Sequence, residues 1–152
     1  PDVAAIMITN PNTCGLFEPE IKNIADAVHA AGAYFYCDGA NFNAIVGKVR
    51  PGDLGVDAMH INLHKTFSTP HGGGGPGSGP VVLSEALVPF APLPYAVREG
   101  ERFRLVEDQS QASGRRPFGR LTAFHGQMGM FTRARPRTPS SAPTTSARGC
   151  AT

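Results

Sequence analysis

A strand–helix–strand pattern near the start of the chain does most to limit how it can fold. Residues 4–9 form an apolar run without polar alternation, which predicts a strand covered on both faces. The acids and proline of 18–20 open a predicted helix, and apolar residues continue at helical spacing to Ala31, with Gly32 as the C-cap. Residues 33–37 predict a second strand. Strands joined by a helix over short loops form a right-handed crossover, so we expect them to be parallel.

The rest of the chain continues this α/β pattern less regularly. Further elements are predicted as strands at 56–63, 81–83 and 103–106, and as a helix beginning near Thr122. Apolar and polar residues alternate from Met59 to His64, so one face of that strand is apolar and the other polar. The polar face meets either solvent or a polar cavity. Residues 72–79 are rich in glycine and predict a loop, and the prolines of 85–97 predict a connection.

Composition places the chain among globular proteins. It has 152 residues, 41% hydrophobic and 17% charged, which suits one domain. No stretch approaches the roughly 18 apolar residues of a membrane span, so no membrane association is expected. Residues 1–131 hold ten basic and twelve acidic side chains, a net charge of −2. A near-neutral body lacks the basic stripe of nucleic-acid-binding proteins, so no nucleic-acid partner is expected.

The three cysteines, Cys14, Cys37 and Cys150, have neither metal-ligand nor CxxC spacing. We therefore expect no metal site. An odd number of cysteines without a signal peptide favours a reducing, cytoplasmic compartment.

Residues 132–152 differ in composition from the rest of the chain. They contain four arginines and no acid, and from Pro136 onward almost only Pro, Ser, Thr, Ala, Arg and Gly. Such a segment buries too little apolar surface to offset its ordering entropy, so a disordered basic tail is predicted. Four of these residue types, Arg, Ala, Pro and Gly, are favoured by GC-only codons. Two explanations stay open, a frameshift near residue 132 and a natural disordered extension.

Polar residues follow each of the three strands that we expect to be parallel. They are Asn10, Asn12 and Thr13 after the first strand, Asp38 to Asn41 after the second, and His64, Lys65, Thr66 and Ser68 after the third. Ligands of open α/β sheets bind beyond the carboxyl ends of parallel strands, so Asp38 and Lys65 should share one rim. Taken alone, the aspartate would be interpreted as a turn or helix-cap residue, and the lysine as a solvent-exposed charge. Their joint placement favours a site.

An aspartate and a lysine on adjacent strand ends suit pyridoxal 5'-phosphate. The amine of Lys65 would form a Schiff base with the cofactor aldehyde. Because only the neutral amine attacks, burial and nearby cations should lower its pKa from about 10.4. Asp38 would pair with the pyridinium nitrogen and keep the ring an electron sink.

Neighbouring residues could complete this cofactor site. Ala40 is small enough to lie flat against the ring, and Asn41 could reach the ring oxygen. His64, Thr66 and Ser68 offer donors for the phosphate.

The motifs of the chain resemble a known family. They are Thr9–Thr13 (TNPNT), Asp38–Ala44 (DGANFNA), His60–Phe67 (HINLHKTF), and Pro70-His71 followed by four glycines. Residues 1 to about 134 resemble glycine decarboxylase, the pyridoxal-phosphate subunit of the glycine cleavage system. More narrowly, they resemble the C-terminal subunit, subunit 2, of the two-subunit bacterial form.

The resemblance implies the aspartate-aminotransferase-like fold (fold type I), a mainly parallel sheet with flanking helices. It implies that Lys65, Asp38 and His64 are catalytic. It also implies that these three residues, with Ala40, Asn41 and Thr66, hold the cofactor. The implied reaction decarboxylates glycine and passes the aminomethyl group to the lipoyl arm of a carrier protein. An N-terminal subunit is the implied hetero-oligomer partner.

Other functions stay open at this stage. A different fold-type-I decarboxylase or aminotransferase would share Asp38 and Lys65, and an inactive fragment of the enzyme would show no activity. The resemblance implies that residues 1–131 are an incomplete large domain running into the start of a C-terminal region. It also implies that the phosphate-binding loop and the ring-stacking residue lie upstream of Pro1. We therefore expect the chain alone to bind cofactor weakly or not at all.

Overall fold

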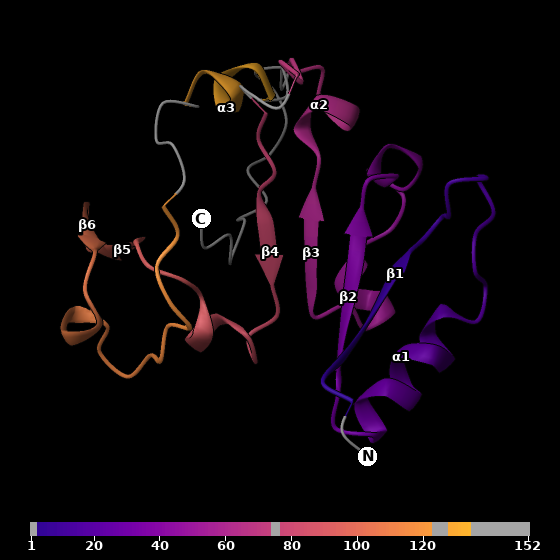
Figure 1. Cartoon of the computed structure of the whole chain (residues 1–152), viewed down its shortest axis with the longest axis horizontal. Helices are drawn as coiled ribbons and strands as arrows, with labels where there is room; N and C mark the ends of the chain where they lie inside the picture. The colour runs from indigo at the N-terminus through magenta and orange to yellow at the C-terminus, as the bar shows by residue number, and fades with distance from the viewer. Residues whose placement is uncertain (1–2, 74–76, 123–127, 135–152) are drawn as a thin grey trace.

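The computed structural model describes residues 3–73, 77–122 and 128–134, which form a four-stranded and a two-stranded sheet (Figure 1). The strands are β1 (Ala5–Thr9), β2 (Tyr34–Gly39), β3 (Ala58–Ile61), β4 (Val81–Leu83), β5 (Tyr95–Glu99) and β6 (Arg102–Val106). The α-helices are α1 (Ile21–Ala30), α2 (Leu63–Thr66) and α3 (Met128–Ala134). The 3-10 helices are η1 (Phe42–Ala44), η2 (Pro51–Leu54), η3 (Val88–Phe90) and η4 (Gln109–Gln111).

The larger sheet has the order β1-β2-β3-β4. The first three strands are parallel, which confirms the predicted crossover, and β4 runs antiparallel to β3, so the sheet is mixed. The register pairs Thr9 with Asp38, and Asp38 with His60. This register brings the carboxyl ends of three parallel strands together, where ligands bind in open α/β sheets.

Helix α1 packs on one face of this sheet (Figure 1). Its residues Ile21 and Ala25 are buried against Phe35 of β2. The helix begins at Ile21 rather than at the predicted acids, because the side chain of Glu18 accepts a hydrogen bond from the main-chain nitrogen of Glu20 in a turn that precedes the helix. Gly32 follows the helix in the left-handed region, with φ of 77°, as its predicted capping role requires.

The same face is covered further along by η1, η2 and the loop between them. Cys37, Ile45 and Met59 form a second buried cluster there. The opposite face of the sheet is open in the described residues, and Met7 of β1 is 62% exposed on it. The prediction that the first strand is covered on both faces is therefore wrong for the described residues, because the packed elements all lie on one side.

Several predicted boundaries also change. β3 ends at Ile61 and not at Leu63, because Leu63 begins α2. The helix predicted to begin near Thr122 falls mostly on residues 123–127, which lie outside the described residues, and the described helix α3 spans Met128–Ala134. Helix α3 includes residues 132–134 of the predicted tail, and the rest of that segment lies outside the described residues. Within the described residues, no helix is long and apolar enough to cross a membrane.

The second sheet is an antiparallel hairpin of β5 and β6, joined at Gly100. β5 lies partly in the segment predicted as a connection. It forms because Tyr95 is buried with Leu93, Val106 and Ala112 in a separate small core.

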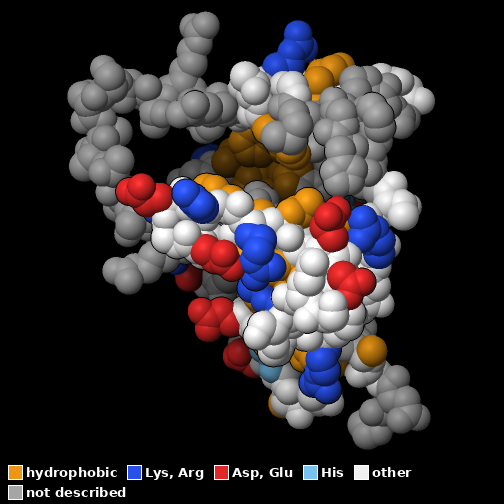
Figure 2. Space-filling model, turned by 90° about the vertical axis from the view of Figure 1, so that its left-hand side faces the viewer, with side chains coloured by type: hydrophobic (Ala, Val, Ile, Leu, Met, Phe, Trp, Pro, Cys, Tyr) orange, Lys and Arg blue, Asp and Glu red, His pale blue; other side chains and the backbone are white. Residues whose placement is uncertain are grey.

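On the molecular face in Figure 2, hydrophobic side chains gather in the depth of a hollow, and acidic and basic side chains are interspersed in front of it.

Gly39 provides a test of how closely β2 and β3 pack. A β-carbon at Gly39 would lie 1.8 Å from the main-chain oxygen of His60, so β2 and β3 could not keep their spacing. We expect Gly39→Ala to lower the free energy of unfolding by about 1–3 kcal/mol, the usual cost of overpacking. Urea unfolding followed by circular dichroism measures this. Gly52→Ala is the matched control, since nothing lies within 4 Å of its added carbon. Equal unfolding midpoints for the two variants would contradict this packing.

Candidate functional site

A carboxylate, an imidazole and a phenol meet on the open face of the sheet. Oδ1 of Asp38 accepts a hydrogen bond from the main-chain nitrogen of Ala40 at 2.8 Å. Nε2 of His60 lies 3.2 Å from the same oxygen, and Nδ1 of His60 lies 2.7 Å from the hydroxyl of Tyr36. The alternation of β2 puts Tyr36 and Asp38 on one face, and the register places His60 beside them.

Burial of this group changes the acidity of its phenol. The side chains of Asp38 and His60 are only 22% and 24% exposed. Burial, and then the negative charge of Asp38, raise the pKa of the Tyr36 phenol. The phenol therefore stays protonated at neutral pH and is available as a hydrogen-bond donor.

Lys65 lies on α2, directly beyond the carboxyl end of β3 and at the same end of the sheet as Asp38 (Figure 1). The prediction that the two residues share one rim is thus confirmed at the level of the backbone. The side chain of Lys65 is exposed, however. The burial expected for this side chain is therefore absent among the described residues.

Three buried polar atoms beside Lys65 have no hydrogen-bond partner among the described residues. They are Nδ1 of His64, Oγ1 of Thr66 and Oγ1 of Thr69. Leaving a buried polar atom unpaired costs roughly 1–3 kcal/mol, so three such atoms in a short segment are unusual outside ligand sites. The chain also turns sharply here, since Ser68 has a left-handed backbone with φ of 56°.

The remaining predicted residues are placed as follows. Ala40 is half-buried and contributes its main-chain N–H to Asp38. The side-chain nitrogen of Asn41 donates to the main-chain oxygens of Pro11 and Asn12, at 3.0 and 2.7 Å. The donor end of Asn41 therefore holds the loop after β1, and its role toward a ring oxygen stays a prediction.

The polar residues after β1 stabilise their own loop. The amide of Asn10 is buried and accepts from the main-chain nitrogen of Glu18 at 2.9 Å. Oδ1 of Asn12 accepts from the main-chain nitrogens of Cys14 and Leu16. This loop supports the site through Asn41.

His60, Tyr36 and Thr69 were missed as site residues by the sequence reasoning. His60 was assigned to the polar face of its strand but given no role. The signal available was the alternation that placed it on the same face as His64. Tyr36 gave no such signal, because it lies in an aromatic run that predicts a buried strand.

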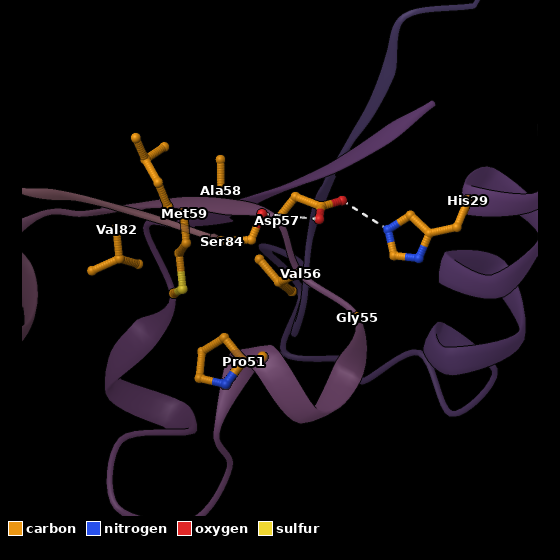
Figure 3. Close-up of a pocket in the computed structure, with 11 residues that line it drawn as sticks. His29, Pro51, Gly55, Val56, Asp57, Ala58, Met59, Val82 and Ser84 are labelled. Carbon is orange, nitrogen blue, oxygen red and sulfur yellow. Dashed lines mark hydrogen bonds and ion pairs between the residues drawn. The ribbon is translucent and has the colours of Figure 1, made fainter. Parts of the chain in front are cut away.

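A cavity of about 450 Å³ lies at the opposite end of the sheet (Figure 3). Its lining is largely apolar and includes Val56, Met59 and Val82. Its one carboxylate, Asp57, is hydrogen-bonded to groups of the protein itself. Within the described residues, no group of three or more His, Cys, Asp or Glu side chains could hold a metal ion.

Asp57 joins four elements at this end of the sheet. Its carboxylate lies 2.7 Å from Nε2 of His29 on α1 and accepts from the main-chain nitrogen of Phe35 on β2 and from Oγ of Ser84 beyond β4. Figure 3 shows His29 and Ser84 reaching Asp57 from two sides. Burial opposes ionisation of Asp57, but the bonds from Phe35 and His29 outweigh it and lower the pKa of this carboxyl below 3.8.

The chain is similar to proteins named probable glycine dehydrogenase (decarboxylating) subunit 2. It is 72% identical over 132 residues to the one from Caulobacter vibrioides. It is 58% identical over 134 residues to the one from Thioalkalivibrio sulfidiphilus and 55% identical over 133 residues to the one from Chlorobium chlorochromatii. The resemblance is confirmed.

These matches cover 87% to 88% of this chain but only 25% to 27% of each relative. The chain thus spans about a quarter of the length of the curated relatives it matches. No family model matches the chain.

The network around Asp57 predicts how stability depends on pH. A lowered pKa means that Asp57 stabilises the fold above its unfolded-state pKa, and this stabilisation is lost as pH falls through the folded-state pKa. We expect Asp57→Asn to lower the free energy of unfolding at pH 7 by about 1.5–3 kcal/mol, the value of hydrogen bonds to a charged group. Below about pH 4 the gap from the parent chain should narrow.

Urea unfolding at a series of pH values measures this dependence. Asp53→Asn is the control, because the Asp53 side chain is 67% exposed and its pairing with Arg50 is a surface contact. A gap between Asp57→Asn and the parent chain that does not change with pH would contradict the assignment.

Proposed function

We propose that this chain is the cofactor-carrying part of a glycine-decarboxylating subunit, with Lys65 as the residue that binds pyridoxal 5'-phosphate covalently. The observation that carries the proposal is the meeting of Asp38 and the Lys65 helix at one rim, in a segment 72% identical to such a subunit. The fold would then be of the aminotransferase type (fold type I), which the parallel β1-β2-β3 sheet supports.

The residues present fit this cofactor. The unpaired Nδ1 of His64 and the hydroxyls of Thr66 and Thr69 suit phosphate oxygens or ring substituents. Asp38 offers a carboxylate for a cationic ring nitrogen, and the small side chain of Ala40 leaves room for a flat ring. When bound, the cofactor supplies an electron sink for the carbanion left by decarboxylation.

Each residue then has a defined task. The Lys65 amine would hold the cofactor covalently, and when free it could accept or return a proton at Nζ. Asp38 holds the proton on the ring nitrogen by its negative charge. His64 and Thr66 orient the cofactor from the segment that carries Lys65.

The names of the relatives support glycine as the substrate and a companion subunit, and the lipoyl acceptor is what the family resemblance implies. We propose glycine as the substrate, a lipoyl carrier protein as the acceptor of the aminomethyl group, and a companion subunit as the oligomeric partner. Cys37 is a buried free thiol and Cys14 an exposed one, which supports a reducing, cytoplasmic location.

Covalent trapping tests the central assignment. The chain has three lysines, Lys22, Lys48 and Lys65. With excess cofactor and borohydride, we expect the added mass on Lys65 and its loss in both Lys65→Ala and Lys65→Arg, because a guanidinium forms no productive imine. Lys48→Arg is the matched control and should keep the label.

In a full-length subunit that carries this segment, Lys65→Ala and Lys65→Arg should both lose glycine decarboxylation entirely. Label distributed over all three lysines, or activity retained without Lys65, would show that the lysine is misassigned. Labelling of Lys65 together with transamination of glutamate, and none of glycine, would favour an aminotransferase instead.

A second prediction concerns the charge of Asp38. Asp38→Asn keeps the acceptor for the Ala40 N–H, so folding and cofactor binding should largely persist. Turnover of glycine should fall about 10- to 100-fold in the full-length subunit, the loss expected for one charged hydrogen bond. The Michaelis constant should change less. An Asp38→Asn enzyme with unchanged turnover would reduce Asp38 to a turn cap.

A further inference from the structure

We propose that Tyr36 and His60 are positioning residues that fix the proton arrangement around Asp38, so that its second oxygen, Oδ2, is presented to the cofactor's ring nitrogen. This inference rests on the proposed function. It concerns two residues that have no place among the lysine, aspartate and phosphate contacts already assigned.

The proton positions follow from the partners of the imidazole. The Tyr36 phenol, whose pKa is raised by burial, stays protonated and lies 2.7 Å from Nδ1 of His60. A phenol that donates to Nδ1 requires a lone pair on that nitrogen. The imidazole proton must then be on Nε2.

The other side of the ring leads to the same tautomer independently. Nε2 of His60 is 3.2 Å from Oδ1 of Asp38. A lone pair on Nε2 would face a carboxylate oxygen and repel it, whereas an N–H on Nε2 faces that oxygen with its positive end. Both contacts therefore place a proton on Nε2, and the donating phenol leaves Nδ1 without one.

This arrangement leaves one carboxylate oxygen for a ligand. Oδ1 is engaged by the Ala40 N–H at 2.8 Å and by the approach of His60. Oδ2 receives no hydrogen bond from a described residue. An imidazole with a proton on Nε2 alone carries no charge, so this arrangement leaves the charge of Asp38 for a cationic ring nitrogen.

The placement is rigid because all three side chains come from paired strands. Tyr36 and Asp38 are two residues apart on β2, and His60 is the register partner of Asp38 on β3. Sites supported by strands hold their geometry better than sites on loops. The positioning therefore depends on the sheet.

Nitrogen NMR tests the tautomer directly in the chain without cofactor. In protein labelled with ¹⁵N-histidine, couplings from the ring protons identify which nitrogen carries the proton, and His60→Gln assigns the His60 signals by their disappearance. We expect His60 to be neutral and protonated on Nε2. In Tyr36→Phe, which is nearly isosteric, the fraction of this tautomer should fall.

Tyr34→Phe is the matched control. Tyr34 is on the same strand and face as Tyr36, but its side chain is 40% exposed and its hydroxyl has no partner among the described residues. It should leave the His60 signals unchanged. His60 protonated on Nδ1 or on both nitrogens in the parent chain would overturn the inference, as would a Tyr36→Phe spectrum identical to that of the parent.

A ligand comparison links the tautomer to the ring nitrogen. Pyridoxal phosphate and its analogue with carbon in place of the ring nitrogen are titrated into a full-length subunit that carries this segment, with and without the same substitutions. The preference for the nitrogen ring should fall about 2- to 10-fold in Tyr36→Phe, the value of one neutral hydrogen bond. It should recover in His60→Gln relative to His60→Leu, because glutamine restores a donor near Nε2.

The two failures are distinguishable. If neither compound forms a borohydride-stable bond with Lys65, the proposed function fails, and the tautomer result alone decides the role of Tyr36 and His60. If both compounds bind but Tyr36→Phe and His60→Leu keep the parent's preference, the positioning role is overturned and the proposed function stands.

Discussion

The register between β2 and β3 is the constraint on which the candidate site depends, and Asp57 sets it. Immediately before β3, the main-chain nitrogen of Asp57 donates to the oxygen of Phe35 while its carboxylate accepts from the nitrogen of Phe35. This double attachment fixes where β3 starts along β2. Three residues later, the same register places His60 beside Asp38. A shift of one residue would turn His60 toward the buried face and separate the two side chains.

The two ends of the sheet thus have separate tasks. At one end the carboxylate of Asp57 has all its bonds within the protein, to α1, β2 and the residue after β4. At the other end one oxygen of Asp38, and polar atoms of His64, Thr66 and Thr69, have no hydrogen-bond partner in the part of the chain that the structure describes. The hydrogen-bonded carboxylate of Asp57 stabilises the fold, whereas the unpaired polar atoms near Asp38 indicate where a ligand would bind.

The sequence was sufficient for the parallel crossover and for the shared rim of Asp38 and Lys65, because both follow from local periodicity and strand order. It was insufficient where the outcome depends on packing between distant segments. The burial of Tyr95 against Val106 turns a proline-rich connection into β5, and no local signal carries that contact. The role of His60 depends on a register partner 22 positions earlier in the chain. The exposure of the Lys65 side chain likewise depends on which layers pack on the sheet, and the local sequence pattern does not predict that packing.

The open face of the sheet links solvent exclusion to charge. Met7 pairs with Tyr36, and Val81 pairs with His60, so these exposed apolar side chains share the face that carries Asp38. Any layer that covers Met7 and Val81 must also remove water from around the carboxylate. Removal of water lowers the local dielectric constant and strengthens every attraction between Asp38 and a cation. Apolar contacts to Met7 and Val81 therefore strengthen the attraction between Asp38 and a cation on the same face.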